Sequence, residues 1–135
     1  PAKMEEKNHK LQEKYRQIRE NEVRYETKDL EDAELAIVAF GSAARISQKA
    51  IEIAREQGIK VGLFRPITLW PFPQEEIAEL SKKLKGILVV EINAGQMVYD
   101  VRYAVEGRVP VKHYGRLGGI VPDPDEIIEV LKQLD

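Results

Sequence analysis

The sequence predicts a three-layer α/β/α domain with a mostly parallel sheet of about five strands. Continuous apolar runs, typical of strands buried on both faces, alternate along the chain with segments whose apolar residues recur at helical spacing. This alternation generates βαβ units and hence parallel strands. A further short strand precedes the alternation and is polar at every second residue, which predicts an edge strand, antiparallel to its neighbour, with one buried face.

Residues 1–22 are predicted to form a charged linker helix, and residues 23–135 the α/β domain. Leu11, Tyr15 and Ile18 recur at helical spacing and therefore share one face of that helix. A helix with one narrow apolar stripe usually lies over another surface or joins two domains. A solvated N-terminal tail is the alternative interpretation.

The remaining elements follow from local patterns. Strands are expected at residues 23–27, 35–40, 59–64, 87–92 and 109–114. Helices are expected at residues 42–57, 75–84, 95–106 and 123–134. Ser42 is expected to cap the first of these helices, and Gly58 and Gly86 to end the helices before them.

The composition excludes several classes of function. The chain has 135 residues and a net charge of -2, so it offers no basic field for nucleic acid. It contains no cysteine, which excludes disulfides, thiolate metal sites and Fe–S ligation within this chain. No apolar run is long enough for a membrane span, and the charged start has no signal peptide, so we expect a cytoplasmic protein. Because Pro1 rather than Met comes first, we expect a processed or truncated polypeptide.

The loops that follow the parallel strands are expected to meet at one edge of the sheet, where α/β folds place their sites. In the loop at residues 65–73, three prolines restrict the backbone around Arg65, Trp70 and Phe72. An aromatic surface of this kind is typical of an interface anchor. The alternative is that Trp70 and Phe72 pack on the domain's own core.

Three other loops reach the same edge. Asn93 and Gln96 bring two amides to a strand-to-helix turn, where they could hydrogen-bond a ligand or a neighbouring backbone. The alternative is that Asn93 and Gly95 only form the turn. Arg116 stands among glycines, which suits a contact with another domain or subunit, or a surface ion pair. The turn at residues 41–42 could hold an anion, although simple helix capping explains it as well.

The sequence assembles no reaction centre. His9 and His113 lack a nucleophile or a paired carboxylate at a recognisable spacing, so neither a catalytic triad nor a metal site can be argued. Glu91 ends a strand and could act as a general base, but no second catalytic group accompanies it. We therefore predict no catalytic, cofactor-binding or metal-binding residue in this chain.

Four segments together resemble one family. They are residues 38–45 (VAFGSAAR), 58–73 (GIKVGLFRPITLWPFP), 90–97 (VEINAGQM) and 114–119 (YGRLGG). They are similar to the C-terminal domain, itself like that of transketolase, of the alpha subunit of 2-oxoacid:ferredoxin oxidoreductases, most like the 2-oxoglutarate type. The resemblance covers essentially the whole chain, and the run RPITLWPFP is its most specific part.

The resemblance implies an enzyme that decarboxylates a 2-oxoacid on thiamine diphosphate, reduces ferredoxin through Fe–S clusters and forms an acyl-CoA. Its thiamine diphosphate, Mg, Fe–S clusters and coenzyme A would be held outside this chain. Partners would be the N-terminal thiamine-binding domain, the beta subunit and gamma or delta subunits. The isolated chain is then expected to be inactive, with Arg65, Trp70, Phe72, Asn93, Gln96 and Arg116 as interface candidates.

Two rival interpretations remain. One is another thiamine-dependent enzyme, such as transketolase, against which residues 70–73 and 115–119 argue. The other is a free-standing α/β module that binds coenzyme A or a nucleotide, which the general fold permits.

Overall fold

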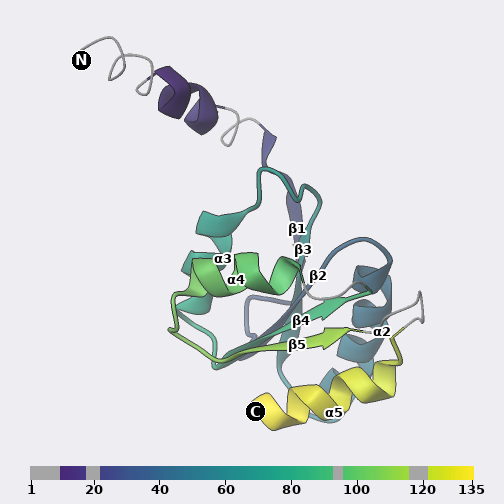
Figure 1. The fold of residues 1–135 in the computed structure, drawn as a ribbon. Coiled ribbons are helices and arrows are strands. Elements are labelled where there is room, and N and C mark those ends of the chain that lie inside the picture. The colour runs from purple at the N-terminus through teal and green to yellow at the C-terminus, as the bar shows by residue number, and fades with distance from the viewer. Residues whose placement is uncertain (1–9, 18–21, 93–95, 116–121) are drawn as a thin grey trace.

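A computed structural model of the chain describes residues 10–17, 22–92, 96–115 and 122–135 (Figure 1). Its strands are β1 (Tyr25–Lys28), β2 (Leu35–Ala39), β3 (Val61–Pro66), β4 (Gly86–Glu91) and β5 (Val111–Gly115). Its labelled helices are α2 (Ser42–Glu56), α3 (Gln74–Ser81), α4 (Met97–Val105) and α5 (Pro124–Leu134). The strands form one sheet in the order β1-β3-β2-β4-β5. Only β1 is antiparallel to its neighbour, as the sequence predicted.

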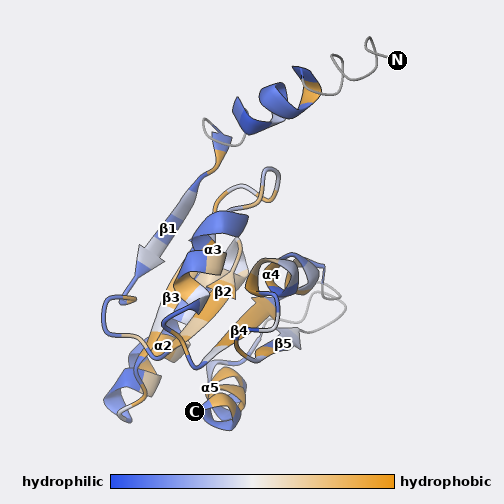
Figure 2. Ribbon diagram, turned by 90° about the vertical axis from the view of Figure 1, so that its left-hand side faces the viewer, coloured by the Kyte–Doolittle hydropathy of each residue, from blue (hydrophilic) through white to orange (hydrophobic). Residues whose placement is uncertain are grey.

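The helices cover the sheet in two layers, as Figures 1 and 2 show. Apolar residues of α2 and α5 pack on one face against alternate residues of the central strands, including Ile37 and Leu88. Residues of α3 and α4 pack on the other face against the intervening residues, including Val38 and Val89. Because β2 and β4 face helices on both sides, every residue in them is buried. The predicted three-layer α/β/α fold is confirmed.

Three local predictions are wrong. Gly41, whose φ of 62° suits glycine, takes the N-cap position of α2, so Ser42 lies inside the helix and makes no capping hydrogen bond. Helix α3 ends at Ser81, and Gly86 instead begins β4, where an added Cβ would lie 3.2 Å from Leu134. All four residues of β1 are exposed, because no helix covers this edge strand closely.

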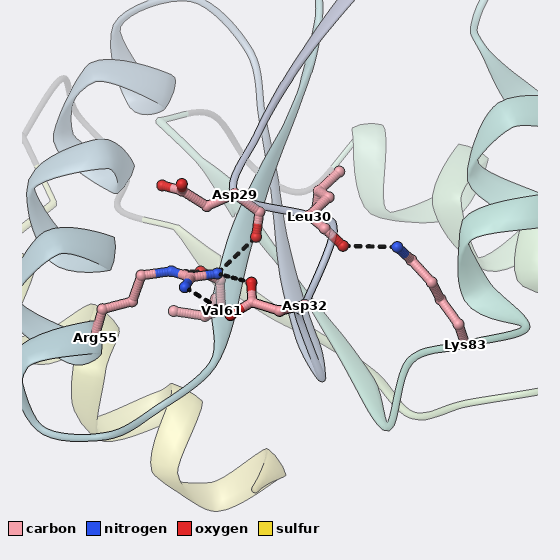
Figure 3. Close-up of polar contacts among 6 residues, drawn as sticks. All are labelled: Asp29, Leu30, Asp32, Arg55, Val61 and Lys83. Atoms are coloured by element: carbon pink, nitrogen blue, oxygen red, sulfur yellow. Dashed lines mark hydrogen bonds and ion pairs between the residues drawn. The ribbon is translucent and has the colours of Figure 1, made fainter.

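The loop between β1 and β2 is fastened from both faces of the sheet (Figure 3). Arg55 of α2 donates hydrogen bonds to the carbonyl oxygens of Asp29 (2.6 Å) and Val61 (2.8 Å). From the opposite side, Lys83 Nζ donates to the carbonyl oxygen of Leu30 at 2.6 Å. These bonds to main-chain acceptors fix the path by which the chain passes from the edge strand into the centre of the sheet.

Residues 10–17 are helical and project beyond the sheet at the end where β1 begins, as Figures 1 and 2 show. The chain joins the body at Arg24, whose carbonyl oxygen accepts hydrogen bonds from the amides of Ile67 (2.9 Å) and Thr68 (3.2 Å). Within the described part of the chain, no helix has both the length and the apolar character needed to cross a membrane.

Candidate functional site at the carboxyl edge of the sheet

The connections that leave β2 and β4 diverge. From β2 the chain passes through α2 to β3 on one side, and from β4 it passes through α4 to β5 on the other. Such a divergence opens a crevice beyond the carboxyl ends of the two strands, which is the usual place for a site in open α/β sheets. A cavity of about 470 Å³ lies there. It is lined by Phe40, Gly41, Ser42, Leu69, Val90, Glu91, Ile92, Gln96, Met97 and Asp100.

Glu91, at the end of β4, is committed to the start of α4. Its carboxylate accepts hydrogen bonds from the backbone amides of Met97 (2.7 Å) and Val98 (3.3 Å). A carboxylate at this position satisfies amides that have no partner within the helix and lies at the positive end of the helix dipole. The geometry therefore gives Glu91 a structural task, whereas a general base needs a free lone pair directed at substrate.

His113 of β5 lies beside this carboxylate. Its Nε2 is 3.1 Å from Glu91 Oε2, close enough for an ion pair when the imidazole is protonated. The same Nε2 is buried and makes no hydrogen bond with the described residues. Glu91 thus joins the first turn of α4 to the wall of the cavity, and His113 contacts the same carboxylate.

Apart from Glu91 of β4, the polar side chains that line the cavity come from the starts of α2 and α4. Ser42 and Gln96 are exposed, and neither side chain caps its helix. Asp100 lies one turn into α4, and partial burial raises the pKa of its carboxyl group. With apolar walls from Phe40, Leu69 and Met97, the cavity suits an apolar group with a hydrogen-bonding end.

The two aromatic residues of the loop at residues 67–73 differ in burial. Trp70 is 63% exposed, whereas Phe72 is partly buried against the core on the α3 and α4 face. Thr68 Oγ1 donates to the carbonyl oxygen of Pro71 at 3.0 Å, so the loop is braced internally. Trp70 therefore does not pack on the domain's own core, whereas Phe72 does.

The other interface candidates differ in position. Arg65 belongs to β3, away from the cavity, and its Nη1 lies 3.6 Å from Glu26 Oε2 on β1. Gln96 lines the cavity. Asn93 and Arg116 lie outside the described residues.

Sequence reasoning missed several residues at this site. Phe40 and Leu69 are 41% and 47% exposed and form part of the cavity wall, although each adjoins a motif that the sequence analysis selected. Tyr15 contacts Trp70, and the helical stripe with Leu11 was the available signal. Asp100 carried no signal, because an acid in a helix ordinarily faces solvent.

The donor set does not suit a metal or cluster. The chain has no cysteine, and among residues 10–17, 22–92, 96–115 and 122–135 no three acidic or histidine side chains gather as a metal site would require. Fe–S ligation therefore does not fit these residues. The described arrangement offers packing and hydrogen-bonding surface at the carboxyl edge.

This architecture defines the class: a three-layer α/β/α domain with a mostly parallel sheet and a crevice at its carboxyl edge. Residues 33–127 match the family "Pyruvate:ferredoxin oxidoreductase core domain II". The chain belongs to this family, which confirms the resemblance drawn from the sequence.

Curated relatives include two kinds of subunit. Ketoisovalerate oxidoreductase subunit VorB of Methanothermobacter marburgensis is 44% identical over 97% of this chain, which spans 37% of that relative. The 2-oxoglutarate synthase subunit KorA of the same organism is 36% identical over 73% of the chain, which spans 26% of that relative. The chain therefore spans well under half the length of these relatives, and they do not single out the 2-oxoglutarate type.

Solved structures share the fold. A 2-oxoglutarate:ferredoxin oxidoreductase from Magnetococcus marinus superposes with a TM-score of 0.78 at 22% identity, covering 99% of this chain and 23% of that one. A split-gene transketolase superposes with a TM-score of 0.69 at 15% identity, covering 81% and 41%. At these identities the likeness establishes the fold alone.

Proposed function

We propose that this chain is the interface domain of the alpha subunit of a thiamine-diphosphate-dependent 2-oxoacid:ferredoxin oxidoreductase. Residues 1–22 would link it to a thiamine-binding domain. The enzyme would decarboxylate a 2-oxoacid oxidatively, form an acyl-CoA and reduce ferredoxin, in the cytoplasm. Family membership over residues 33–127 supports the enzyme class. The organising role rests on a separate observation.

That observation is the exposure of apolar side chains at the carboxyl edge. Phe40, Leu69 and Trp70 are 41%, 47% and 63% exposed, and two of them form the wall of the cavity. Large apolar side chains gathered at one edge are typical of a surface that another protein surface covers. We infer that Arg65, Phe72, Asn93, Gln96 and Arg116 are further candidates for contacts with partner domains or subunits.

The cofactors of the proposed enzyme would bind elsewhere. Fe–S clusters need thiolates, and this chain has none. Thiamine diphosphate and Mg would lie on the preceding domain and the beta subunit, as the family resemblance implies. In this proposal the domain contributes shape and contacts, and its side chains take no part in a chemical step.

The proposed substrate is a 2-oxoacid, and the two candidates are ketoisovalerate and 2-oxoglutarate. The greater identity to the VorB relatives favours ketoisovalerate over 2-oxoglutarate. A parallel assay of both acids with the purified complex distinguishes them, because specificity differences between substrates appear in kcat/KM.

The test is to co-express the complete subunit with its partner subunits and to measure anaerobic, coenzyme-A-dependent reduction of ferredoxin. Trp70→Ala and Arg116→Ala are expected to weaken subunit assembly or turnover. Tyr103→Ala removes an aromatic of similar exposure (71%) from α4 and serves as the matched control. Normal assembly and turnover in both test variants would refute the interface role, and absence of 2-oxoacid oxidation would refute the enzyme class.

The cavity itself favours a second candidate function, a binding site for coenzyme A or a nucleotide. Its volume of about 470 Å³ lies in the range of small-molecule sites. Calorimetric titration of the complete subunit with coenzyme A and with ATP tests this function. Binding that Leu69→Trp abolishes would support it, and the absence of any heat of binding would contradict it.

A further inference from the structure

An aromatic pair joins the N-terminal helix at residues 10–17 to the α/β domain. Trp70 Nε1 donates a hydrogen bond to Tyr15 Oη at 3.2 Å. The two rings meet edge to face, with centroids 5.6 Å apart and planes at 84°. This T-shaped geometry is a favoured arrangement for aromatic rings, and the hydrogen bond satisfies the only polar group of the indole.

A second attachment lies at the other end of the same segment. The Arg24 backbone amide donates to Thr68 Oγ1 at 3.1 Å. In return, the Arg24 carbonyl oxygen accepts from the amides of Ile67 and Thr68. The loop at residues 67–70 therefore contacts the N-terminal segment at two places. It forms hydrogen bonds with the main chain of Arg24 and an aromatic contact with Tyr15.

Attachment of the N-terminal segment at two points, Tyr15 and Arg24, fixes the direction of the helix, whereas attachment at one point would not. With Arg24 alone, the helix at residues 10–17 could swing about its point of entry. The contact between Tyr15 and Trp70 removes that freedom. Leu69 adjoins Trp70 and lines the cavity, so the element that holds the helix also forms a wall of the candidate site.

We propose that Tyr15 and Trp70 form a joint, which fixes the direction in which the N-terminal helix leaves the α/β domain. The loop at residues 67–70 supports this joint. The joint thereby sets how the polypeptide before the helix meets the carboxyl edge of the sheet. This last consequence rests on the proposed function, whereas the contact that fixes the direction of the helix does not.

The burial of the pair supports a joint that is completed in the larger protein. Tyr15 and Trp70 remain 54% and 63% exposed in mutual contact, and Leu11 on the same helical stripe is 57% exposed. An aromatic pair half open to water adds little to the stability of the fold beyond its area burial. Tyr15 and Trp70 are therefore positioning residues and play no part in chemistry.

The test uses hydrogen–deuterium exchange of the complete subunit, read at peptides that cover residues 10–17 and 66–71. Trp70→Ala is expected to speed exchange in the helix by about ten-fold, since it loses the ring contact and the hydrogen bond. Tyr15→Phe loses only the hydrogen bond, and about five-fold is expected, whereas Trp70→Phe also loses part of the ring contact, and at least five-fold is expected. Adding Tyr15→Phe to Trp70→Phe should have little further effect, because the hydrogen bond is already absent.

Tyr103→Phe provides the control, since it deletes a hydroxyl from another exposed tyrosine, on α4 (71% exposed), and it should leave exchange in the helix at residues 10–17 unchanged. Unchanged exchange in Trp70→Ala, or additive effects of the two phenylalanine variants, would overturn the joint. The readout requires no turnover, so failure of the proposed enzyme activity is recorded separately by the ferredoxin assay.

Discussion

Arg55 of α2 holds Asp32 by two parallel hydrogen bonds, Nη1 to Oδ2 at 3.2 Å and Nη2 to Oδ1 at 2.9 Å. This fork geometry is specific to arginine, since lysine presents a single ammonium group. The same guanidinium also binds the carbonyl oxygens of Asp29 and Val61. One side chain thus joins a helix, a loop and a strand.

Arg55→Ala should lower the free energy of unfolding by about 2 kcal/mol, because it leaves two partly buried carbonyl groups without their donor. The measurement is urea-induced unfolding followed by circular dichroism. Arg45→Ala, at an exposed position of the same helix, should change stability by less than about 0.5 kcal/mol. Equal effects of the two variants would contradict the assigned role of Arg55.

The pair formed by Arg55 and Asp32 should also make the stability of the fold depend on pH. The hydrogen bond from Arg55 lowers the pKa of Asp32 below its ordinary value of 3.8 in the folded protein. A lowered folded-state pKa stabilises the fold above pH 3.8, and this contribution is lost as the pH falls through the folded pKa. The difference in Tm between the unaltered protein and Asp32→Asn should therefore be constant near neutrality and shrink below that pH. A difference that grows on acidification would contradict it.

Gly62→Ala should destabilise the domain because there is no room for a side chain. A Cβ at this position would lie 2.5 Å from the carbonyl oxygen of Asp29, which is main chain and cannot turn aside. Overpacking of this kind costs about 1–3 kcal/mol. The reference is Gly107→Ala, where the Cβ would meet nothing and only the strain of a φ of 77° applies. Thermal unfolding should place Gly62→Ala lower in Tm.

Glu91→Ala should cost about 1–2 kcal/mol, the usual range for loss of a helix-capping acceptor. Glu91→Gln retains one oxygen acceptor but loses the charge at the helix terminus, so a smaller loss is expected. Amide exchange in α4 should rise in both variants, most at Met97 and Val98, whose amides lose their acceptor. Glu129→Ala, at an exposed site of α5, should leave the stability and the exchange of α4 unchanged.

Trp70→Ala and Phe72→Ala should fail in different ways. Phe72 packs against the core, so its truncation should lower Tm, whether or not partner subunits are present. Trp70 is mostly exposed, so its truncation should leave the Tm of the α/β domain nearly unchanged while assembly of the complex weakens. Denaturation and co-purification of the same two variants separate these outcomes. A large loss of Tm in Trp70→Ala would show that the indole supports the domain itself.

Periodicity determined the layers, the parallel sheet and its antiparallel edge, whereas the family was indicated by the resemblance of four segments to known proteins. Buried strands and amphipathic helices each carry a pattern that depends only on which faces meet water. Local geometry was less predictable. Ser42 has the chemistry of an N-cap, but the left-handed φ of Gly41 places the helix boundary one residue earlier.

Only the tertiary structure decided which loop residues meet. Trp70 and Phe72 are two residues apart, yet one is exposed and the other faces the core, because loop geometry has no fixed period. Tyr15 and Trp70 are 55 residues apart and meet only in the folded protein. Glu91 reads in the sequence as a free acid, and the return of α4 over β4 gives it two amide partners. Sequence patterns record burial, whereas these contacts depend on the three-dimensional path of the chain.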